Sequence, residues 1–371
     1  MFYISHIGRI YNICYIFNCC SQFEKPKSMR FIKSILIIII MVSCQNKENK
    51  KAENSNMIFG TKSLIVKPII NLSEKLDSED EIISVSVDKN GINTLIIHSA
   101  PQYRTENGMF AVIKSDKPKN YTFIRFDLKG NETFRTLIKD EYYNFHNVNF
   151  LPTKEILLIC GRSRYINEDE IDKNARIYNL KGDLLRDFVA GDGIQDVQID
   201  DDGNIWTSYF DEGIFGNYGW NEPIGTPGLI CWNQDGQKIW EFEPTDGLDH
   251  MADCYAMNID SDNNTWFYYY TEFPLVKLDN SKQIKFWNTD IGGSSSLNIS
   301  DNKVLMTDGY DGNNFILFEI KGNKLKKTKK IKFKSEENKE LNKRNYITSF
   351  GSNIGFLSEN KIYLTNMNEI K

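Results

Sequence analysis

Several signatures that would define an enzyme or a helical fold are missing from this sequence. From about residue 58 onwards it has almost no helical periodicity, which excludes helix bundles and alternating α/β folds. It contains no HExxH, GxSxG or phosphate-binding glycine motif, so no common hydrolase or nucleotide site can be identified. Its formal net charge of -5 lacks the basic excess of a nucleic-acid-binding protein, and we expect no nucleic-acid partner.

Cysteine is scarce in the part of the chain that is expected to fold. After residue 44 only Cys160, Cys231 and Cys254 remain, on three different predicted strands. This is not the paired arrangement of a disulfide framework, so we expect buried free thiols. The apolar run from Ile35 to Val42 is also much shorter than the roughly 20 residues that a membrane-spanning helix needs.

That short run forms part of a predicted secretion signal, residues 29–43. The signal starts with the basic segment Met29-Arg30-Phe31-Ile32-Lys33 and ends at a small residue, Ser43. Its end, Met41-Val42-Ser43-Cys44, resembles the lipobox of bacterial lipoproteins, although leucine is more usual where Met41 stands. The resemblance implies cleavage before Cys44 and lipidation of Cys44 with acyl chains such as palmitate. The alternative is an uncleaved transmembrane anchor.

The segments on either side of the signal are polar or unassigned. Residues 1–28 fit no targeting pattern and indicate either a start codon assigned too early or a genuine extension. Residues 44–57 predict a flexible tether, because up to Asn56 they hold no apolar residue larger than alanine. We therefore expect the membrane to be a partner through the lipid anchor. Gln45, where inner-membrane retention would need aspartate, points to the outer membrane of the cell envelope, with a periplasmic or surface-facing domain.

Residues 58–371 contain short apolar strands separated by two interleaved sets of turns. One set includes Asp127-Leu128-Lys129-Gly130 and Asn233-Gln234-Asp235-Gly236. The other includes Asp88-Lys89-Asn90-Gly91 and Asp201-Asp202-Gly203-Asn204. Turns of the first set recur roughly every 42–54 residues, which is the period of a four-stranded propeller blade.

These repeats predict an all-β fold, a β-propeller of six four-stranded blades, with seven blades as the alternative. Five complete blades fit between Ile82 and Phe333, and a sixth starts at Tyr346 but has only three strands. We expect the isolated strand from Leu64 to Ile70 to supply the fourth, because closing the ring removes an open edge. Pro68 is tolerated on such an outermost strand, which needs no ladder donor.

One segment resembles the blade repeat of the NHL-type, regucalcin/gluconolactonase-type and sensor-type propellers. It is Ile199-Asp200-Asp201-Asp202-Gly203-Asn204-Ile205-Trp206, and residues 259–266 match it in part. The resemblance implies the fold but not an activity, since propellers host many unrelated functions. The regucalcin type holds a divalent cation at its channel mouth. Its ligands cannot be matched here, so we expect no cofactor and no assigned metal site, and leave a cation at the channel mouth open.

The long connections all fall on one face of the expected propeller, at residues 99–120, 161–173, 211–226, 244–253 and 335–344. Functional residues gather on loops held by a rigid scaffold, so we place the candidate site on this face. The candidate ligand-binding residues are His98, His146, Gln195, Asp196, Asp211, Glu212, Tyr218, Trp220, His250 and Asp253. Tyr218 and Trp220 offer flat rings that could stack on a ligand. The alternative is a loop that packs as a hydrophobic plug, with histidines that only make structural hydrogen bonds.

Two classes of function are compatible with the sequence. The first is a membrane-anchored extracytoplasmic module that binds a glycan, peptide or protein through the loop-rich face. The second is a hydrolase or lyase that uses a metal or carboxylates at the mouth of the central channel. The lack of any catalytic motif favours the binding module over an enzyme.

Overall fold

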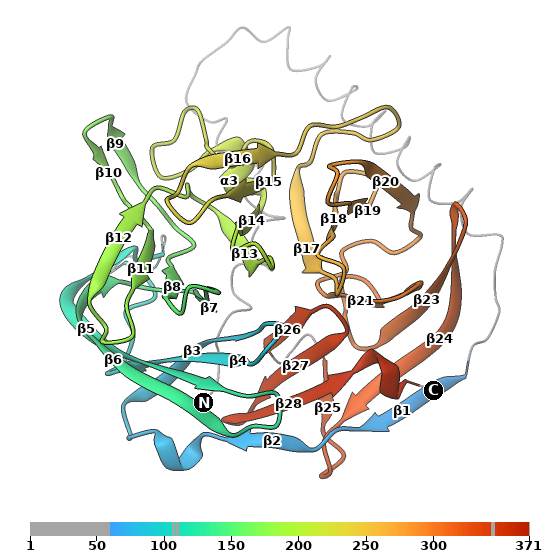
Figure 1. The fold of residues 1–371 in the computed structure, drawn as a ribbon, viewed down its shortest axis with the longest axis horizontal. Helices are drawn as coiled ribbons and strands as arrows, with labels where there is room; N and C mark the ends of the chain where they lie inside the picture. Colours follow the sequence, from blue (N-terminus) through green and yellow to red (C-terminus); the bar gives the residue numbers. More distant parts are fainter. Residues whose placement is uncertain (1–59, 106–107, 109–110, 343–345, 371) are drawn as a thin grey trace, which may run out of the picture. The chain divides into compact units, whose positions relative to one another are not determined.

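A computed structural model describes residues 60–105, 108, 111–342 and 346–370. The predicted signal peptide, the lipidation site Cys44 and the tether lie outside these residues. Within the described ranges no helix is long and apolar enough to cross a bilayer. Figure 1 shows the folded unit, from Thr61 onwards, as a ring of small β-sheets.

Six four-stranded antiparallel blades follow one another around the ring, which confirms the predicted fold and excludes the seven-blade alternative. The first blade consists of β3 (Asp80–Val87), β4 (Ile92–His98), β5 (Lys114–Phe126) and β6 (Glu132–Tyr143). The second consists of β7 (Asn147–Phe150), β8 (Ile156–Ile159), β11 (Ala175–Tyr178) and β12 (Leu184–Phe188). The third consists of β13 (Ile194–Ile199), β14 (Ile205–Tyr209), β15 (Leu229–Trp232) and β16 (Lys238–Glu241). The fourth blade consists of β17 (Asp253–Ile259), β18 (Thr265–Tyr270), β19 (Pro274–Leu278) and β20 (Ile284–Asn288). The fifth consists of β21 (Leu297–Ser300), β22 (Lys303–Thr307), β23 (Phe315–Lys321) and β24 (Lys324–Lys334). The sixth consists of β26 (Tyr346–Phe350), β27 (Asn353–Ser358), β28 (Lys361–Asn366) and β2 (Pro68–Asn71).

The N-terminal segment closes the ring, but as two strands rather than one. β2 pairs antiparallel with β28 and is the outermost strand of the sixth blade, with Pro68 opposite Tyr363. The preceding strand β1 (Thr61–Ile65) pairs in parallel with β24 of the fifth blade. The single strand expected from Leu64 to Ile70 was therefore wrong in its extent, because the chain passes from one blade to the next at Val66 and Lys67.

Several short elements lie outside the blade strands. They are the 3₁₀ turns η2 (Ser73–Lys75) and η3 (Met367–Glu369), the hairpin β9 (Tyr165–Asn167) and β10 (Glu170–Ile171), the strand β25 (Glu340–Leu341), and the one-turn helix α3 (Asp211–Phe215). The hairpin and α3 are insertions that the blade repeat does not predict, and both follow the second strand of a blade.

Polar side chains join the innermost strands of neighbouring blades. Each innermost strand carries one such residue, and each bonds the backbone of the next blade. The bonds are Ser86 to Val148 O, Asn149 to Val197 O, Gln198 to Met257 O, Asn258 to Leu297 O and Asn298 to Gly351 O, with Thr348 Oγ1 accepting from Val87 N. The ring is thus held by hydrogen bonds around its centre as well as by apolar packing between blades.

The predicted turns owe their conformation to their first residue. In the turn between β5 and β6, Asp127 Oδ1 accepts hydrogen bonds from the backbone N–H groups of Lys129 and Asn131, both at 2.9 Å. Asn179 makes the same two bonds between β11 and β12, to Lys181 and Asp183. Short polar side chains that bond their own backbone two residues on stabilise such turns, which is why Asp and Asn recur there.

Candidate functional site

Two faces of the ring differ in their connections. Strands alternate in direction within each blade, so the tight turns of both predicted sets lie on one face. The opposite face carries the connections from the second to the third strand of each blade, and those from one blade to the next. We call this second face the loop-rich face; the hairpin β9–β10 and the helix α3 both belong to it.

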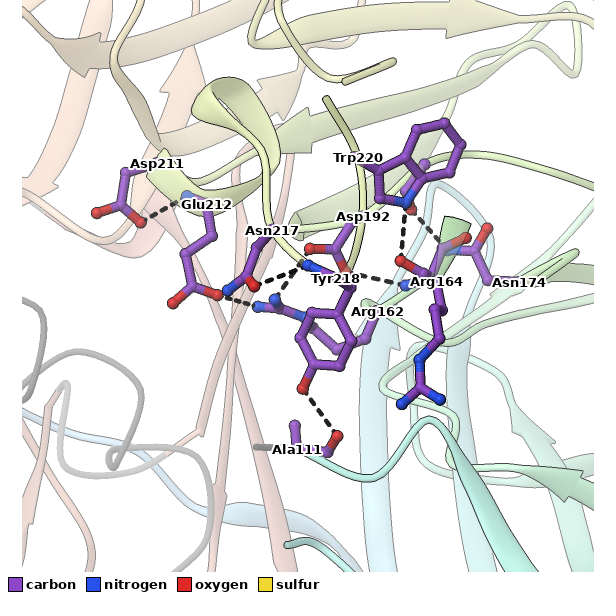
Figure 2. Close-up of polar contacts among 12 residues, drawn as sticks. Ala111, Arg162, Arg164, Asn174, Asp192, Asp211, Glu212, Asn217, Tyr218 and Trp220 are labelled. Carbon is purple, nitrogen blue, oxygen red and sulfur yellow. Dashed lines mark hydrogen bonds and ion pairs between the residues drawn. The ribbon is translucent and has the colours of Figure 1, made fainter. Parts of the chain in front are cut away.

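A buried arginine organises the loop-rich face over the second and third blades. Arg162 follows β8, and only 11% of its side chain is exposed. Its Nη2 lies 2.9 Å from Asp192 Oδ2, and its Nη1 donates to Glu212 Oε2 at 2.6 Å. The guanidinium carbon also lies 4.3 Å from the ring centroid of Tyr218 and 5.3 Å from that of Phe210. Figure 2 shows Asp192, Glu212 and Tyr218 around this arginine.

The loop at residues 210–226 is fastened to two neighbouring blades. The indole nitrogen of Trp220 donates to Ser163 O at 2.8 Å, and the Tyr218 hydroxyl donates to Ala111 O at 2.8 Å (Figure 2). The backbone N–H of Tyr165 donates to Tyr218 O at 3.0 Å. Trp220 is only 8% exposed, so its indole serves as a packing anchor and not as an open platform. The ring of Tyr218 is half-buried and lies against the guanidinium of Arg162.

Burial changes the acid–base character of this cluster. Loss of solvent raises the pKa of Asp192 to about 6, although the positive charge of Arg162 opposes the shift. Burial also raises the pKa of Asp211 at the start of α3. Burial and the charge of Arg162 together lower the pKa of His146 to about 4, so this imidazole is neutral at physiological pH. Because Asp192 is almost fully buried, we assign it to holding Arg162 and not to contact with a ligand.

The three candidate histidines lie in separate surroundings. His98 Nδ1 contacts Asp80 Oδ1 at 2.9 Å and its Nε2 contacts Thr122 Oγ1 at 2.6 Å, all within the first blade. His146 accepts a hydrogen bond from the backbone N–H of Gly161 at 3.0 Å. His250 is exposed in the connection before β17. In the part of the chain that the structure describes, no three His, Cys, Asp or Glu side chains are grouped as a metal site.

Two candidate carboxylates lie near the ends of innermost strands. Asp196 lies on β13 and Asp253 starts β17, and these two innermost strands contact each other. Burial raises the pKa of the Cys254 thiol, and the negative charges of Asp253 and Asp196 raise it further. Burial raises the pKa of Tyr346, and the negative charge of Asp196 adds to the shift. The Tyr346 hydroxyl lies 3.5 Å from Ser84 Oγ. These residues come from the innermost strands of the first, third, fourth and sixth blades. Gln195 sits at a bulge in β13, next to Asp196.

Sequence reasoning missed three residues that lie beside the candidate site residues, namely Arg162, Ser84 and Tyr346. Arg162 was included only within a long connection, and Ser84 and Tyr346 were treated as ordinary strand residues. A comparison of equivalent positions could have found part of this pattern. The innermost strands of the first, third and fourth blades all have a register shift near their starts, at Ile83, Gln195 and Tyr255. Bulges of this kind often re-aim side chains beside functional sites.

The fold and the arrangement of this face define a six-bladed β-propeller with one loop-rich face. A family model described as the YxzG family matches residues 229–365, from the third strand of the third blade into the sixth. This match covers less than half of the chain. None of the curated proteins matches the chain.

Several solved structures resemble the chain at a low level. A chain of the mitotic checkpoint complex has a TM-score of 0.45 and 7% identity, covering 78% of this chain and 79% of that chain. Virginiamycin B lyase from Staphylococcus aureus has a TM-score of 0.38 and 14% identity, covering 76% and 94% respectively. A streptogramin B lyase has a TM-score of 0.41 and 9% identity, covering 73% and 98%. Similarities at this level say nothing about what this chain binds or catalyses.

Proposed function

We propose that this protein is a lipid-anchored binding module of the cell envelope, which takes its ligand on the loop-rich face. The binding rim comprises the loop at residues 211–226 and the channel mouth near Asp196 and Asp253. The ligand is a glycan, peptide or protein, held by side chains that the rigid propeller positions.

The observation that supports this proposal is the fixed conformation of the loop at residues 211–226. Loops that only connect strands do not need a buried ion pair, a ring-stacked arginine and an anchored tryptophan. Here Arg162 and Trp220 hold the loop against the second blade. Ordering a loop before binding lowers the entropy cost of association, and this is a property of binding surfaces. The same loop presents Phe215, 71% exposed, and the half-buried Asp211.

A direct test uses the domain from residue 58 to 371 on printed glycan and peptide arrays. We expect Asp211→Ala and Phe215→Ala to weaken any ligand found, because both lie on the rim. The matched control is Asp235→Ala, an exposed residue of the same blade in a tight turn on the opposite face. Binding that depends on Asp235 and is unaffected by the rim variants would refute the proposal.

The anchor is tested separately, since Cys44 lies outside the described residues. We expect Cys44→Ala to release the full chain from membranes and to abolish its labelling by a clickable fatty acid. Label retained by the Cys44→Ala protein would overturn the lipidation hypothesis without affecting the binding rim.

An enzymatic function is the alternative, and the position of Asp196 and Asp253 on contacting innermost strands of neighbouring blades is the observation that favours it. Carboxylates from neighbouring blades at one channel mouth could bind a cation or act in proton transfer. Metal analysis of the purified, tagless domain tests it, and one tightly held cation per chain, lost in Asp196→Asn, would favour the enzyme.

A further inference from the structure

A second feature of the loop-rich face is a group of aromatic rings over the fourth and fifth blades. Tyr255 lies near the start of β17, Phe273 in the turn between β18 and β19, and Tyr310 in the connection after β22. Tyr270 ends β18. Tyr310 is 58% exposed and Tyr270 is 47% exposed, whereas Tyr255 and Phe273 are half-buried. We call these four residues the aromatic corner.

The rings of the corner stand in fixed relation to one another. Tyr310 meets Tyr255 at 81° and Phe273 at 85°, with ring centroids 6.1 and 6.2 Å apart. Tyr270 packs against Phe273 at a centroid distance of 5.3 Å. Tyr310, Tyr255 and Phe273 therefore pack against one another as a single cluster of rings, with Tyr270 at its side. Edge-to-face pairs of this kind are favourable, so the exposed rings are held without a ligand.

Backbone features fix the positions of the rings of Tyr310 and Phe273. Gly293, with φ +74°, lies under the ring of Tyr310, and a Cβ there would collide with the ring atoms. Glu272 and Phe273 both have positive φ values, of 56° and 55°, which are uncommon for residues with side chains. Such conformations persist only where the surroundings impose them, and they are common at ligand sites.

The chemistry of the corner is amphipathic. The hydroxyl groups of Tyr270 and Tyr310 make no hydrogen bond to any described residue, so they are available to solvent or to a ligand. Carboxylates adjoin the rings in sequence, with Glu272 before Phe273 and Asp311 after Tyr310, and both are exposed. Apolar ring faces beside hydroxyl and carboxylate acceptors suit a sugar ring, which has apolar C–H faces and hydroxyl groups around its edge. The carboxylates disfavour an anionic ligand.

The size of the corner argues against a protein partner. An aromatic side chain offers about 150–250 Å² of surface, so two rings near half exposure supply on the order of 200 Å². A stable protein interface buries about 800 Å² on each partner. One or two sugar rings match the smaller area.

Resting on the proposed binding function, we propose that the aromatic corner is a subsite for a neutral oligosaccharide, with Tyr310 and Tyr270 stacking on pyranose rings. Tyr255 lies two residues after the channel-mouth residue Asp253, so the corner adjoins the proposed binding rim. The helix α3 contacts β17 as well, which brings the two parts of the face together.

The test uses an array of neutral tetrasaccharides of the β-glucan, mannan, xylan and chitin types, followed by calorimetric titration of those that bind. We expect Tyr310→Ala and Tyr270→Ala each to weaken binding about tenfold or more. Tyr310→Phe keeps the ring and should retain binding within about threefold. The matched control is Tyr142→Ala, because Tyr142 is 48% exposed on the outermost strand of the first blade.

Three outcomes separate this inference from the function on which it rests. No binding of any tetrasaccharide at roughly 1 mM overturns the inference. A peptide ligand that needs Asp211 and Phe215 but not Tyr310 also overturns it, and leaves the proposed function standing. Equal losses in Tyr310→Ala and Tyr142→Ala would show a non-specific effect and count against the corner. Thermal melting of Tyr310→Ala checks that the exposed ring can be removed without unfolding. If this variant unfolds, the binding of Tyr270→Ala is compared with that of Tyr310→Phe instead.

Discussion

The indole nitrogen of Trp206 donates a hydrogen bond of 3.0 Å to Oδ2 of Asp200, six residues earlier in the chain. Oδ1 of the same carboxylate accepts from the backbone N–H groups of Asp202 and Asn204. Trp266 and Asp260 repeat the arrangement in the fourth blade, with an indole bond of 2.7 Å. The repeat noticed in the sequence therefore has a physical basis, since one aspartate shapes the turn and fixes the tryptophan that follows it.

Removal of this carboxylate should destabilise the domain. Asp200 is 7% exposed, and Asp200→Ala leaves a buried indole N–H and two turn N–H groups without their acceptor. We expect a loss of about 2–3 kcal/mol in the free energy of unfolding, measured by urea denaturation. The side chain of its neighbour Asp201 is exposed and pairs with Lys89 at the surface, so Asp201→Ala should cost at most about 1 kcal/mol. Equal losses in the two variants would contradict this account.

The parts of the fold that depend on short segments could be predicted from the sequence. Strands such as Leu229–Trp232 and Thr265–Tyr270 can be located from the sequence, because each is a short apolar run with turn residues nearby. The six blades followed from the spacing of the turns, and the N-terminal closure followed from the missing fourth strand of the sixth blade. The pairing of β1 with β24 did not follow, since a parallel pair between distant segments leaves no local pattern.

The candidate site was harder to predict because its contacts join residues far apart in the chain. Arg162 meets Glu212 across 50 positions, and Tyr255 meets Tyr310 across 55. No spacing in the sequence indicates either pair. Among the candidates, Asp196 and Asp253 lie on contacting innermost strands, whereas the three histidines lie in separate surroundings. Whether any of them binds a ligand stays a prediction.

The closing strand allows a matched comparison between two isoleucines of the N-terminal segment. Ile70 on β2 is 5% exposed and packs in the core, whereas Ile65 on β1 is 56% exposed. We expect Ile70→Ala to lower the free energy of unfolding by about 2–4 kcal/mol through lost burial and the cavity left behind. Ile65→Ala should change it by no more than about 0.5 kcal/mol. If Ile70→Ala melts at the same temperature as the parent domain, the closure of the ring by β2 contributes little.

The stability of the domain should fall in mild acid because of His146. Its pKa is about 4 in the folded chain, through burial and the charge of Arg162, against about 6.5 in an unfolded one. Between these values the unfolded chain binds a proton that the folded chain does not. The stabilisation is therefore complete above about pH 6.5 and is lost as the pH falls toward 4. From pH 7 to pH 5 we expect His146 to account for about 2 kcal/mol of lost stability.

The control for this pH dependence is His146→Asn, which does not titrate and keeps an acceptor for the Gly161 N–H. Asp192, with a pKa raised to about 6, acts in the opposite direction, because the folded chain then holds the extra proton. Asp192 is present in both proteins, so its effect cancels when their pH profiles are compared by chemical denaturation. Parallel profiles for the parent and His146→Asn would show that His146 does not titrate as expected.

The last prediction concerns Trp220, which the sequence offered either as a stacking platform or as part of a plug. Its indole is buried, donates to Ser163 O and packs at a centroid distance of 5.2 Å against Tyr165. Trp220→Ala should therefore cost about 3–5 kcal/mol of folding stability. Phe215→Ala, in the same loop but 71% exposed, should leave the stability within about 0.5 kcal/mol of the parent. Both variants would be compared by thermal melting and by binding to the same arrays. A stable Trp220→Ala domain that has lost its ligand would instead show that the indole contacts the ligand, and that the loop rearranges to expose it.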